Sequence, residues 1–271
     1  MIKVNQQIVK ISDLNNSSLT KEKADILKQM DAYREVYEYA TFDQLDFDVS
    51  VKLQIIESSV LLRKSGARFA TFARSRCNEK YWKRTDNGGF QLLPTVSPHQ
   101  AIDDIFYNGH EYAFECATAV IIIFYKAVLN NIGKANFNRL FADLYLHDWQ
   151  YDEDLELHGY KGSDYLPGDC AYFKNPDYNP DTPQWKGENT IVLDETLYFG
   201  HGIGITTRER IIEVLNLKRK DDAKQSAYLS DEIVRLHTAH LSYFAVRYEP
   251  VVWYDRNSAI ISTIGSITYV A

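Results

Sequence analysis

The residues best suited to chemistry in this sequence are a glutamate and a cysteine that stand side by side before its longest apolar run. They are Glu115 and Cys116, within the stretch "YAFECATAVIIIFYKAVL" at residues 112–129. Two interpretations are open for the cysteine. It is a packing residue, because free cysteine behaves as a small hydrophobe, or it is a nucleophile, because a helix N-terminus favours a thiolate.

A partner for such a thiol must come from elsewhere in the chain, and two residues stand out. His201 lies in "YFGHGIGI", between small residues that let a backbone or a substrate approach closely. Glu188 lies in "PQWKGENTIVL" at the mouth of an apolar strand, where the alternative is a solvated strand end. The other histidines fall mostly in loops or on helices, where an exposed histidine is the ordinary case.

Composition narrows the class of protein. The chain has 271 residues, enough for one large domain or two small ones. Its 30 basic and 37 acidic residues leave a formal charge of −7, which argues against nonspecific nucleic-acid binding. The first residues lack the apolar region of a secretory signal, and the longest apolar run is shorter than the ~20 residues of a membrane span. We therefore expect cytoplasmic synthesis and no membrane partner.

Neither the cysteines nor the acidic residues have the spacing of a metal site. Cys77, Cys116 and Cys170 are a sparse, odd set, which suits a reduced compartment. The acidic stretches at 43–48 and 151–156 lack the glycine and the terminal glutamate of a calcium loop. We therefore expect no metal and no cofactor.

Capping signals predict two helices near the N-terminus. Ser18 is placed to cap a helix over residues 19–32. Thr41 and Gln44 form a capping box before a second helix, which ends at Gly66 in the position that favours a left-handed glycine.

The middle of the chain predicts a hairpin and then two helices. "KYWKR" and "FQLLP" flank the turn "TDNGG", while Ser97 and Pro98 open a helix that stops at Asn108. The helix that begins at Cys116 runs to about Asn131. Its apolar residues face all round, which indicates a helix buried in a core.

After a short helix over residues 133–144, the pattern becomes extended. Strands are expected at "LYLHDW", "DCAYFKN", "NTIVLD" and "LYFGHGIGI". Residues 206–220 and 226–237 return to helix, and the β-prone tail at 250–271 suits an edge strand, a partner-binding segment or a poorly ordered end. Consecutive strands without helices between them predict an antiparallel sheet packed on helices, an α+β fold.

This order of elements is that of papain-like cysteine enzymes, in which a buried helix begins at the nucleophile and a sheet supplies its partner. There the helix N-terminus lowers the pKa of the thiol, and its free N–H groups receive an oxyanion. On this interpretation the chain is a single domain with an N-terminal helical part (1–66), a catalytic core (67–249) and the tail (250–271).

Several blocks of the sequence resemble, in order and spacing, the small bacterial transglutaminases of Bacillus, which are spore-coat protein-glutamine γ-glutamyltransferases. The blocks are "YAFECATAVIII", "GDCAYFKNP", "QWKGEN" and "YFGHGIGI", with further matches at "KSGARFATF" and "QSAYL". The resemblance spans about residues 40–247, is loose before residue 40 and does not reach the tail. It implies a papain-like core and a calcium-independent enzyme that forms ε-(γ-glutamyl)lysine cross-links and releases ammonia.

The resemblance also implies roles for single residues, by their position in these blocks. Cys116 matches the nucleophile and Glu188 its paired carboxylate, while Glu115 is placed to assist as a nearby base. The role of His201 stays open: it is an orienting group, a substrate contact or a residue without a part in the reaction. Cys170 matches as well, but an apolar strand is where a structural cysteine belongs.

A carboxylate is a weak base for a thiol, so the site must adjust both groups. With ordinary pKa values near 4.3 and 8.5, the proton transfer is uphill by about 6 kcal/mol. We expect burial to raise the pKa of Glu188 and the helix N-terminus to lower that of Cys116. A transferase must also keep water from the thioester, and three aromatic residues in the matching blocks are candidates for a dry passage, with core packing as the alternative: Phe69, Trp149 and Trp185.

The resemblance implies glutamine- and lysine-bearing protein substrates, spore coat proteins in particular. It also implies a monomer that is made in the mother cell and deposited in the spore coat. Two alternatives remain. One is a cysteine amidase or peptidase with the same core, in which water takes the acyl group. The other is a non-catalytic coat scaffold that assembles through its aromatic-rich surface.

Overall fold

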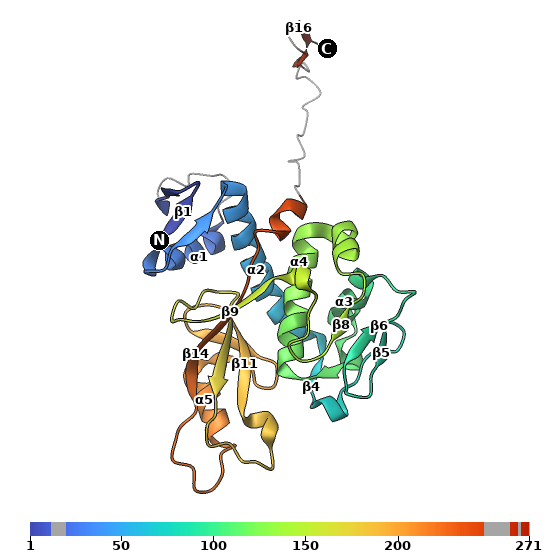
Figure 1. Cartoon of the computed structure of the whole chain (residues 1–271), viewed down its shortest axis with the longest axis vertical. Helices are drawn as coiled ribbons and strands as arrows, with labels where there is room; N and C mark the ends of the chain where they lie inside the picture. The colour runs from blue at the N-terminus through green and yellow to red at the C-terminus, as the bar shows by residue number, and fades with distance from the viewer. Residues whose placement is uncertain (12–19, 247–260, 265–266, 271) are drawn as a thin grey trace.

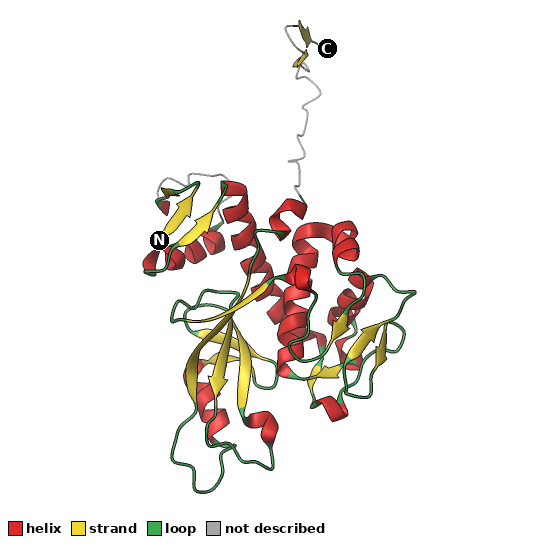
Figure 2. Cartoon of the chain, viewed as in Figure 1, coloured by secondary structure: helices red, strands yellow, loops and turns green. Residues whose placement is uncertain are grey.

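The computed structural model of the chain describes residues 1–11, 20–246, 261–264 and 267–270 (Figure 1). The helices are α1 (Lys21–Ala32), α2 (Phe42–Ser65), α3 (Pro98–Tyr107), α4 (Cys116–Leu140) and α5 (Arg208–Asn216). Helices α2 and α3 pack against the long helix α4, the largest sheet packs against α4 as well, and α5 lies on the sheet (Figure 2).

The largest sheet has six strands in the order β13-β12-β11-β10-β14-β9, and every neighbouring pair is antiparallel. A buried helix that begins at the cysteine and packs on such a sheet confirms the expected α+β, papain-like class. The strands are β9 (Leu157–Lys161), β10 (Cys170–Lys174), β11 (Gly187–Val192), β12 (Leu197–Gly200), β13 (Gly204–Thr207) and β14 (Tyr228–Leu236).

The two faces of this sheet bury different clusters because side chains alternate along a strand. On β10, Cys170 joins the core around α4, whereas Ala171 and Phe173 join a second cluster with Ile211 and Leu215 of α5. The sheet is therefore covered by α4 on one face and by α5 on the other, and its two faces can serve different purposes.

Smaller sheets lie outside this layer. A three-stranded sheet, β2-β1-β3, belongs to the N-terminal part, a parallel pair, β4 and β7, precedes α4, and a third sheet has the order β5-β6-β8. Their strands are β1 (Ile2–Val4), β2 (Gln7–Ile8), β3 (Tyr37–Tyr39), β4 (Arg68–Phe69), β5 (Trp82–Arg84), β6 (Phe90–Leu92), β7 (Ala113–Phe114) and β8 (Tyr145–Leu146). In the tail, β15 (Ile261–Ile264) pairs with β16 (Ile267–Val270).

Local signals in the sequence act as expected at several helix ends. The side chain of Thr41 accepts from the Gln44 N–H at 3.2 Å, and Gly66 closes α2 with φ of 89°, a backbone conformation that disfavours other residues. The first cap differs from the expectation: Thr20, two residues after Ser18, caps α1, and Ser18 lies outside the described residues. The break expected after Asn131 is at Gly133, inside α4.

One predicted helix is wrong: residues 226–237 contain the nine-residue strand β14 instead. The segment carries helix-forming residues, but its backbone pairs with β10 on one side and β9 on the other. Pairing on both sides outweighs a weak local propensity for helix. The block "LYFGHGIGI" likewise holds two strands, β12 and β13, joined by a turn.

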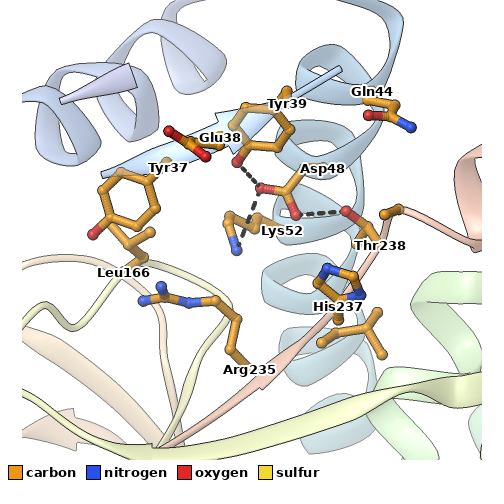
Figure 3. A pocket seen from close by; sticks show the side chains of 12 residues that line it. Tyr37, Glu38, Tyr39, Gln44, Asp48, Lys52, Leu166, Arg235, His237 and Thr238 are labelled. Carbon is orange, nitrogen blue, oxygen red and sulfur yellow. Dashed lines mark hydrogen bonds and ion pairs between the residues drawn. The ribbon is translucent and has the colours of Figure 1, made fainter. Parts of the chain in front are cut away.

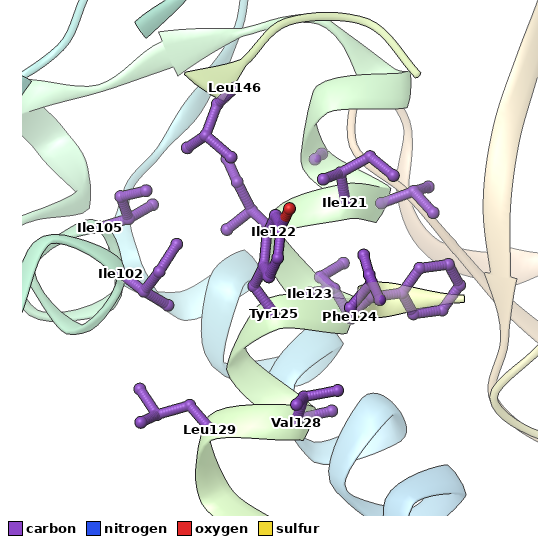
Figure 4. Close-up of a cluster of buried hydrophobic side chains, with 14 of the residues drawn as sticks. Ile102, Ile105, Ile121, Ile122, Ile123, Phe124, Tyr125, Val128, Leu129 and Leu146 are labelled. Atoms are coloured by element: carbon purple, nitrogen blue, oxygen red, sulfur yellow. The ribbon is translucent and has the colours of Figure 1, made fainter. Parts of the chain in front are cut away.

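Helix α4 is the centre of the core. Its side chains from Cys116 to Tyr125 are all buried, and they contact α2, α3 and β11 around the whole helix (Figure 4). By length and composition α4 is apolar enough to span a membrane, but 78% of its most apolar window is buried inside the described structure. Its composition is explained by packing on every side.

The N-terminal part is joined to the large sheet through a buried polar junction (Figure 3). The Asp48 carboxylate of α2 accepts hydrogen bonds from Tyr39 Oη at 2.7 Å and from Thr238 Oγ1 at 2.9 Å. The Lys52 ammonium, one turn further along, lies 3.7 Å from the same carboxylate. Next to this junction the Arg235 guanidinium of β14 forms a bidentate salt bridge with the Asp169 carboxylate. These contacts tie α2 and β3 to the end of β14.

Candidate active site

The first turn of α4 holds the glutamate and the cysteine in one hydrogen-bonded unit. Glu115 is the N-cap of the helix: its Oε2 accepts from the Ala117 N–H at 2.8 Å. Its Oε1 accepts from Cys116 Sγ at 2.9 Å. One carboxylate therefore closes the helix end and contacts the thiol at the same time.

The approach to this turn is fixed by the short parallel pair of strands. Residues Ala113 and Phe114 of β7 pair with Arg68 and Phe69 of β4, so the chain enters α4 from a buried strand. Cys116 is consequently 4% exposed although it stands at a helix terminus.

Strand β11 brings the second carboxyl group and an amide to the thiol. The Asn189 side-chain amide donates to Cys116 Sγ, with Nδ2 and Sγ 3.4 Å apart, and a backbone hydrogen bond from Asn189 also reaches the thiol. Glu188, its neighbour, is close enough for its charge to act on the thiol. Asn189 is not among the residues expected from the sequence; its only signal there is its place beside Glu188 in the block "QWKGEN".

The Glu188 carboxyl is buried in a tight site. It is 2% exposed, and its Oε1 accepts from the Gly202 N–H at 3.1 Å. Gly200 makes room for it, because a Cβ at that position would lie 2.8 Å from the same oxygen. Burial, with a smaller effect of the Glu115 charge, raises the pKa of Glu188 to about 8, although the Gly202 bond opposes this. The expected direction is confirmed, and a pKa near 8 leaves Glu188 partly protonated at neutral pH.

The cysteine differs from the expectation. Burial, followed by the charges of Glu188 and Glu115, raises the pKa of the Cys116 thiol well above its usual range. The prediction that the helix N-terminus lowers this pKa is wrong, because desolvation and two acidic neighbours outweigh the helix. The N–H of Ala117, expected to be free for an oxyanion, is already bonded to Glu115. The resting site is a neutral thiol.

His201 lies beside these groups as a neutral ring. It stacks on Phe114, with ring centroids 4.6 Å apart and planes at 12°, and burial lowers its pKa to about 4. Its Nε2 is buried and has no hydrogen-bond partner among the described residues. The next residue, Gly202, is the one that binds Glu188. His201 is thus the chain neighbour of the residue whose N–H binds the Glu188 carboxyl.

Two of the three expected aromatic residues adjoin the site. Phe69 lies 3.6 Å from the Cβ position of Gly202, next to the Glu188 carboxyl. Trp149 lines a pocket of about 330 Å³ together with Asn189, the amide that contacts the thiol. The pocket is completed by Cys170, Tyr172, Glu232 and Val234.

The third aromatic residue, Trp185, has other surroundings. It packs against the cluster that contains Phe173, and the Lys218 ammonium lies 5.2 Å from its ring centroid. That cluster is the one covered by α5, and the pocket beside Asn189 does not include Trp185. The structure thus brings Phe69 and Trp149 to the candidate site but leaves Trp185 on the other cluster.

The remaining cysteines are buried and unpaired. Burial raises the pKa of Cys77 to about 11 and that of Cys170 further. The pKa of Cys116 is raised too, so the contacts of the three thiols, rather than their pKa values, separate them. Of the three thiols, only Cys116 is bonded to a carboxylate and to a side-chain amide within the described chain.

Comparisons with known proteins find one family over most of the chain. The family model for protein-glutamine gamma-glutamyltransferases matches residues 1–245, which includes the first forty residues. Proteins of that name from Bacillus cereus (strain AH820) and Bacillus anthracis (strain A0248) are each 48% identical over 253 residues, 92% of this chain and 92% of theirs. A solved transglutaminase from Geobacillus stearothermophilus (without C-terminal extension) is 54% identical with a TM-score of 0.74, and the match covers 77% of this chain and 100% of that one.

The family model spans most of the chain, the identities are high, and 77% of the chain matches a solved transglutaminase with a TM-score of 0.74. This chain therefore belongs to the protein-glutamine gamma-glutamyltransferase family.

Proposed function

We propose that this γ-glutamyltransferase works through a thioester on Cys116 and that two carboxyl groups carry its protons. The observation that carries the proposal is the contact set of Cys116 Sγ, which bonds to Glu115 at 2.9 Å and to Asn189 at 3.4 Å. Glu188, with a pKa near 8, adjoins the same atom.

In the first half-reaction Cys116 Sγ attacks the carboxamide carbon of a substrate glutamine. The thiol proton passes to Glu115, which already accepts its hydrogen bond. Asn189 donates to the developing oxyanion, a task that the occupied helix N–H does not perform. Protonated Glu188 gives its proton to the departing nitrogen, ammonia leaves, and the thioester remains. Glu115 is then protonated and Glu188 ionised.

In the second half-reaction the neutral amine of a lysine attacks the thioester carbonyl. Ionised Glu188 takes a proton from that amine, and protonated Glu115 returns its proton to the Cys116 thiolate as the carbon–sulfur bond breaks. The isopeptide is released, and both carboxyl groups return to their starting states. A carboxyl group with a pKa near 8 suits this work because it is partly protonated at neutral pH.

We also propose a biological setting: cross-linking of spore coat proteins by a calcium-independent monomer that is synthesised in the mother cell. The support is the sequence resemblance and the Bacillus origin of the relatives. The absence of calcium-loop spacing in the acidic stretches supports calcium independence.

The experiment is incorporation of a fluorescent primary amine into a glutamine-bearing protein, in the presence of a calcium chelator. Wild type is expected to incorporate the amine and release ammonia; Cys116→Ala is expected to do neither, whereas Cys170→Ala retains activity. Mass spectrometry of the trapped enzyme is expected to find the acyl group on Cys116. An adduct on Cys77 or Cys170, or activity that only calcium restores, contradicts the proposal. Release of ammonia without amine incorporation identifies an amidase instead.

A further inference from the structure

A groove lies between α1, α2 and the turn that joins β11 to β12. We call it the α1–α2 groove. Its volume is about 760 Å³, within the roughly 300–1,000 Å³ of protein ligand sites. Leu53 and Ile56 of α2 are only half-buried in it, so each leaves apolar surface uncovered at the edge of a hydrophobic cluster. The apolar floor is formed by Ile26, Ala32, Leu53, Ile56, Pro167 and Leu193.

The rim of this groove is acidic. Glu22 and Asp25 come from α1, and Asp194 and Glu195 come from the β11–β12 turn; Lys28 is the single basic residue in the described lining. All four carboxylates are exposed. Burial acts against ionisation of Asp194, but hydrogen bonds from its own turn lower its pKa. Four carboxylates around an apolar floor favour a ligand that is both basic and aliphatic.

The groove is connected to the active site by two rigid elements. Along β11, Leu193 is five residues from Glu188, about 17 Å at roughly 3.3 Å per residue. Along α2, Ile56 is seven residues from Arg63, about 10 Å at roughly 1.5 Å per residue, and the Arg63 charge acts on His201. An extended peptide covers a distance of about 10 to 17 Å with about three to five residues.

We propose that the α1–α2 groove docks a basic segment of the lysine-bearing protein substrate, three to five residues from the lysine that reacts. The proposal rests on the proposed function. The apolar floor accepts the aliphatic stems of lysine and arginine side chains, and the rim carboxylates bind their charged ends. Opposite charges also raise the rate of encounter at low salt.

The test compares acceptors of the same reactivity. One peptide has a single lysine followed, four residues later, by three arginines; a second has serines in place of the arginines; the third acceptor is a small free amine. The rim variant is Asp25→Asn with Glu195→Gln. The matched control is Asp221→Asn with Asp222→Asn, which changes the charge equally in the exposed loop after α5.

Wild type is expected to have a lower KM for the arginine peptide than for the serine peptide. In the rim variant, KM for the serine peptide divided by KM for the arginine peptide is expected to fall about 3–10-fold at low salt. The salt dependence of KM for the arginine peptide is expected to weaken as well. The control variant keeps the wild-type ratio. An unchanged ratio in the rim variant, or an equal change in the control, overturns the proposal while leaving the proposed function intact. A dimer that the rim variant dissociates overturns it as well, in favour of a second copy as occupant. Failure of wild type to incorporate any amine refutes the proposed function instead.

Discussion

At the scale of single residues, the candidate site sets two carboxyl groups with different surroundings around one thiol. Glu115 accepts hydrogen bonds from the Ala117 N–H and from the thiol. Glu188 is buried, and its pKa is raised to about 8. Like charges this close do not both ionise without cost, so one proton is shared across the site. The protons for both half-reactions are thus already stored in the resting enzyme.

Substitution of each carboxyl group tests its role. In the proposed mechanism Glu188→Gln removes the acid for ammonia and the base for lysine, so kcat is expected to fall by about 10²–10⁴. Glu115→Gln removes the group that takes the thiol proton in that mechanism, so it is expected to slow thioester formation by a similar factor, while its amide oxygen still caps α4. Steady-state amine incorporation measures both. Near-full activity of Glu188→Gln together with a dead His201→Ala assigns the base to the histidine.

The buried Glu188 also predicts a pH dependence of stability. Its pKa is raised on folding from near 4.5 to about 8. A raised pKa contributes stability that is fully present below pH 4.5 and is lost as pH rises through 8. The amide side chain of Glu188→Gln does not titrate. The free energy of unfolding of the variant minus that of wild type is therefore expected to increase as pH rises from 4.5 to 8, by about 3 kcal/mol at pH 7. Urea unfolding of both proteins from pH 4.5 to 8.5 measures this difference. A difference that stays the same at every pH contradicts the prediction.

At the scale of elements, the site depends on three that are distant in sequence. Helix α4 supplies the thiol, β11 supplies Glu188 and Asn189, and the turn between β12 and β13 supplies the N–H of Gly202. Phe69 of β4 and the pocket with Trp149 flank them. The aromatic residues expected to exclude water therefore adjoin the site on the face toward α4, whereas the face toward α5 packs as a separate core cluster.

This difference between faces predicts different product ratios for two tryptophans. Trp149→Ala opens the pocket beside Asn189, so the ratio of glutamate to isopeptide formed is expected to rise several-fold, with a loss of stability similar to that of Trp185→Ala because both side chains are half-buried against a hydrophobic cluster. Trp185→Ala is expected to leave that ratio unchanged and to cost about 2–3 kcal/mol of stability, less than a fully buried aromatic does. Product analysis at fixed amine and urea unfolding provide the two readouts. A raised ratio of glutamate to isopeptide in Trp185→Ala contradicts this prediction and assigns Trp185 to the lining of the substrate passage.

At the scale of the whole molecule, the N-terminal part is attached through charges as well as through its own small core. That core, which includes Met30, Leu45 and Val49, shares α2 with the main one. The polar junction at Asp48 and Lys52 then connects α2 to the end of β14 (Figure 3). Since α2 also lines the α1–α2 groove, this junction positions the groove relative to the sheet.

Removal of the junction carboxylate is expected to be costly. Asp48→Ala leaves the Lys52 ammonium buried without its counter-charge, which costs about 3–5 kcal/mol of stability. The Asp46–Lys23 pair joins the same helix to α1 and leaves the Asp46 side chain 60% exposed, so it serves as the control, and Asp46→Ala is expected to cost less than about 1 kcal/mol. Urea unfolding measures both. If Asp48→Ala with Lys52→Met is no more stable than Asp48→Ala alone, the buried charge is not the cause.

The sequence by itself determined the features that a few neighbouring residues decide. Glu115 and Cys116 are adjacent, so the cap and the thiol meet in any fold that starts a helix there. Thr41, Gln44 and Gly66 likewise bound α2 through contacts within one turn. The apolar run from Ala119 predicted a core helix because no polar face was left to expose.

Only the tertiary structure decided the rest. Residues 226–237 form a strand because β10 and β9 offer backbone partners on both sides, which no local pattern reveals. Asn189 reaches Cys116 across 73 positions of sequence. The pKa values of Glu188 and Cys116 follow from how completely the fold removes them from water, and desolvation is a property of everything packed around a group rather than of its neighbours in the chain.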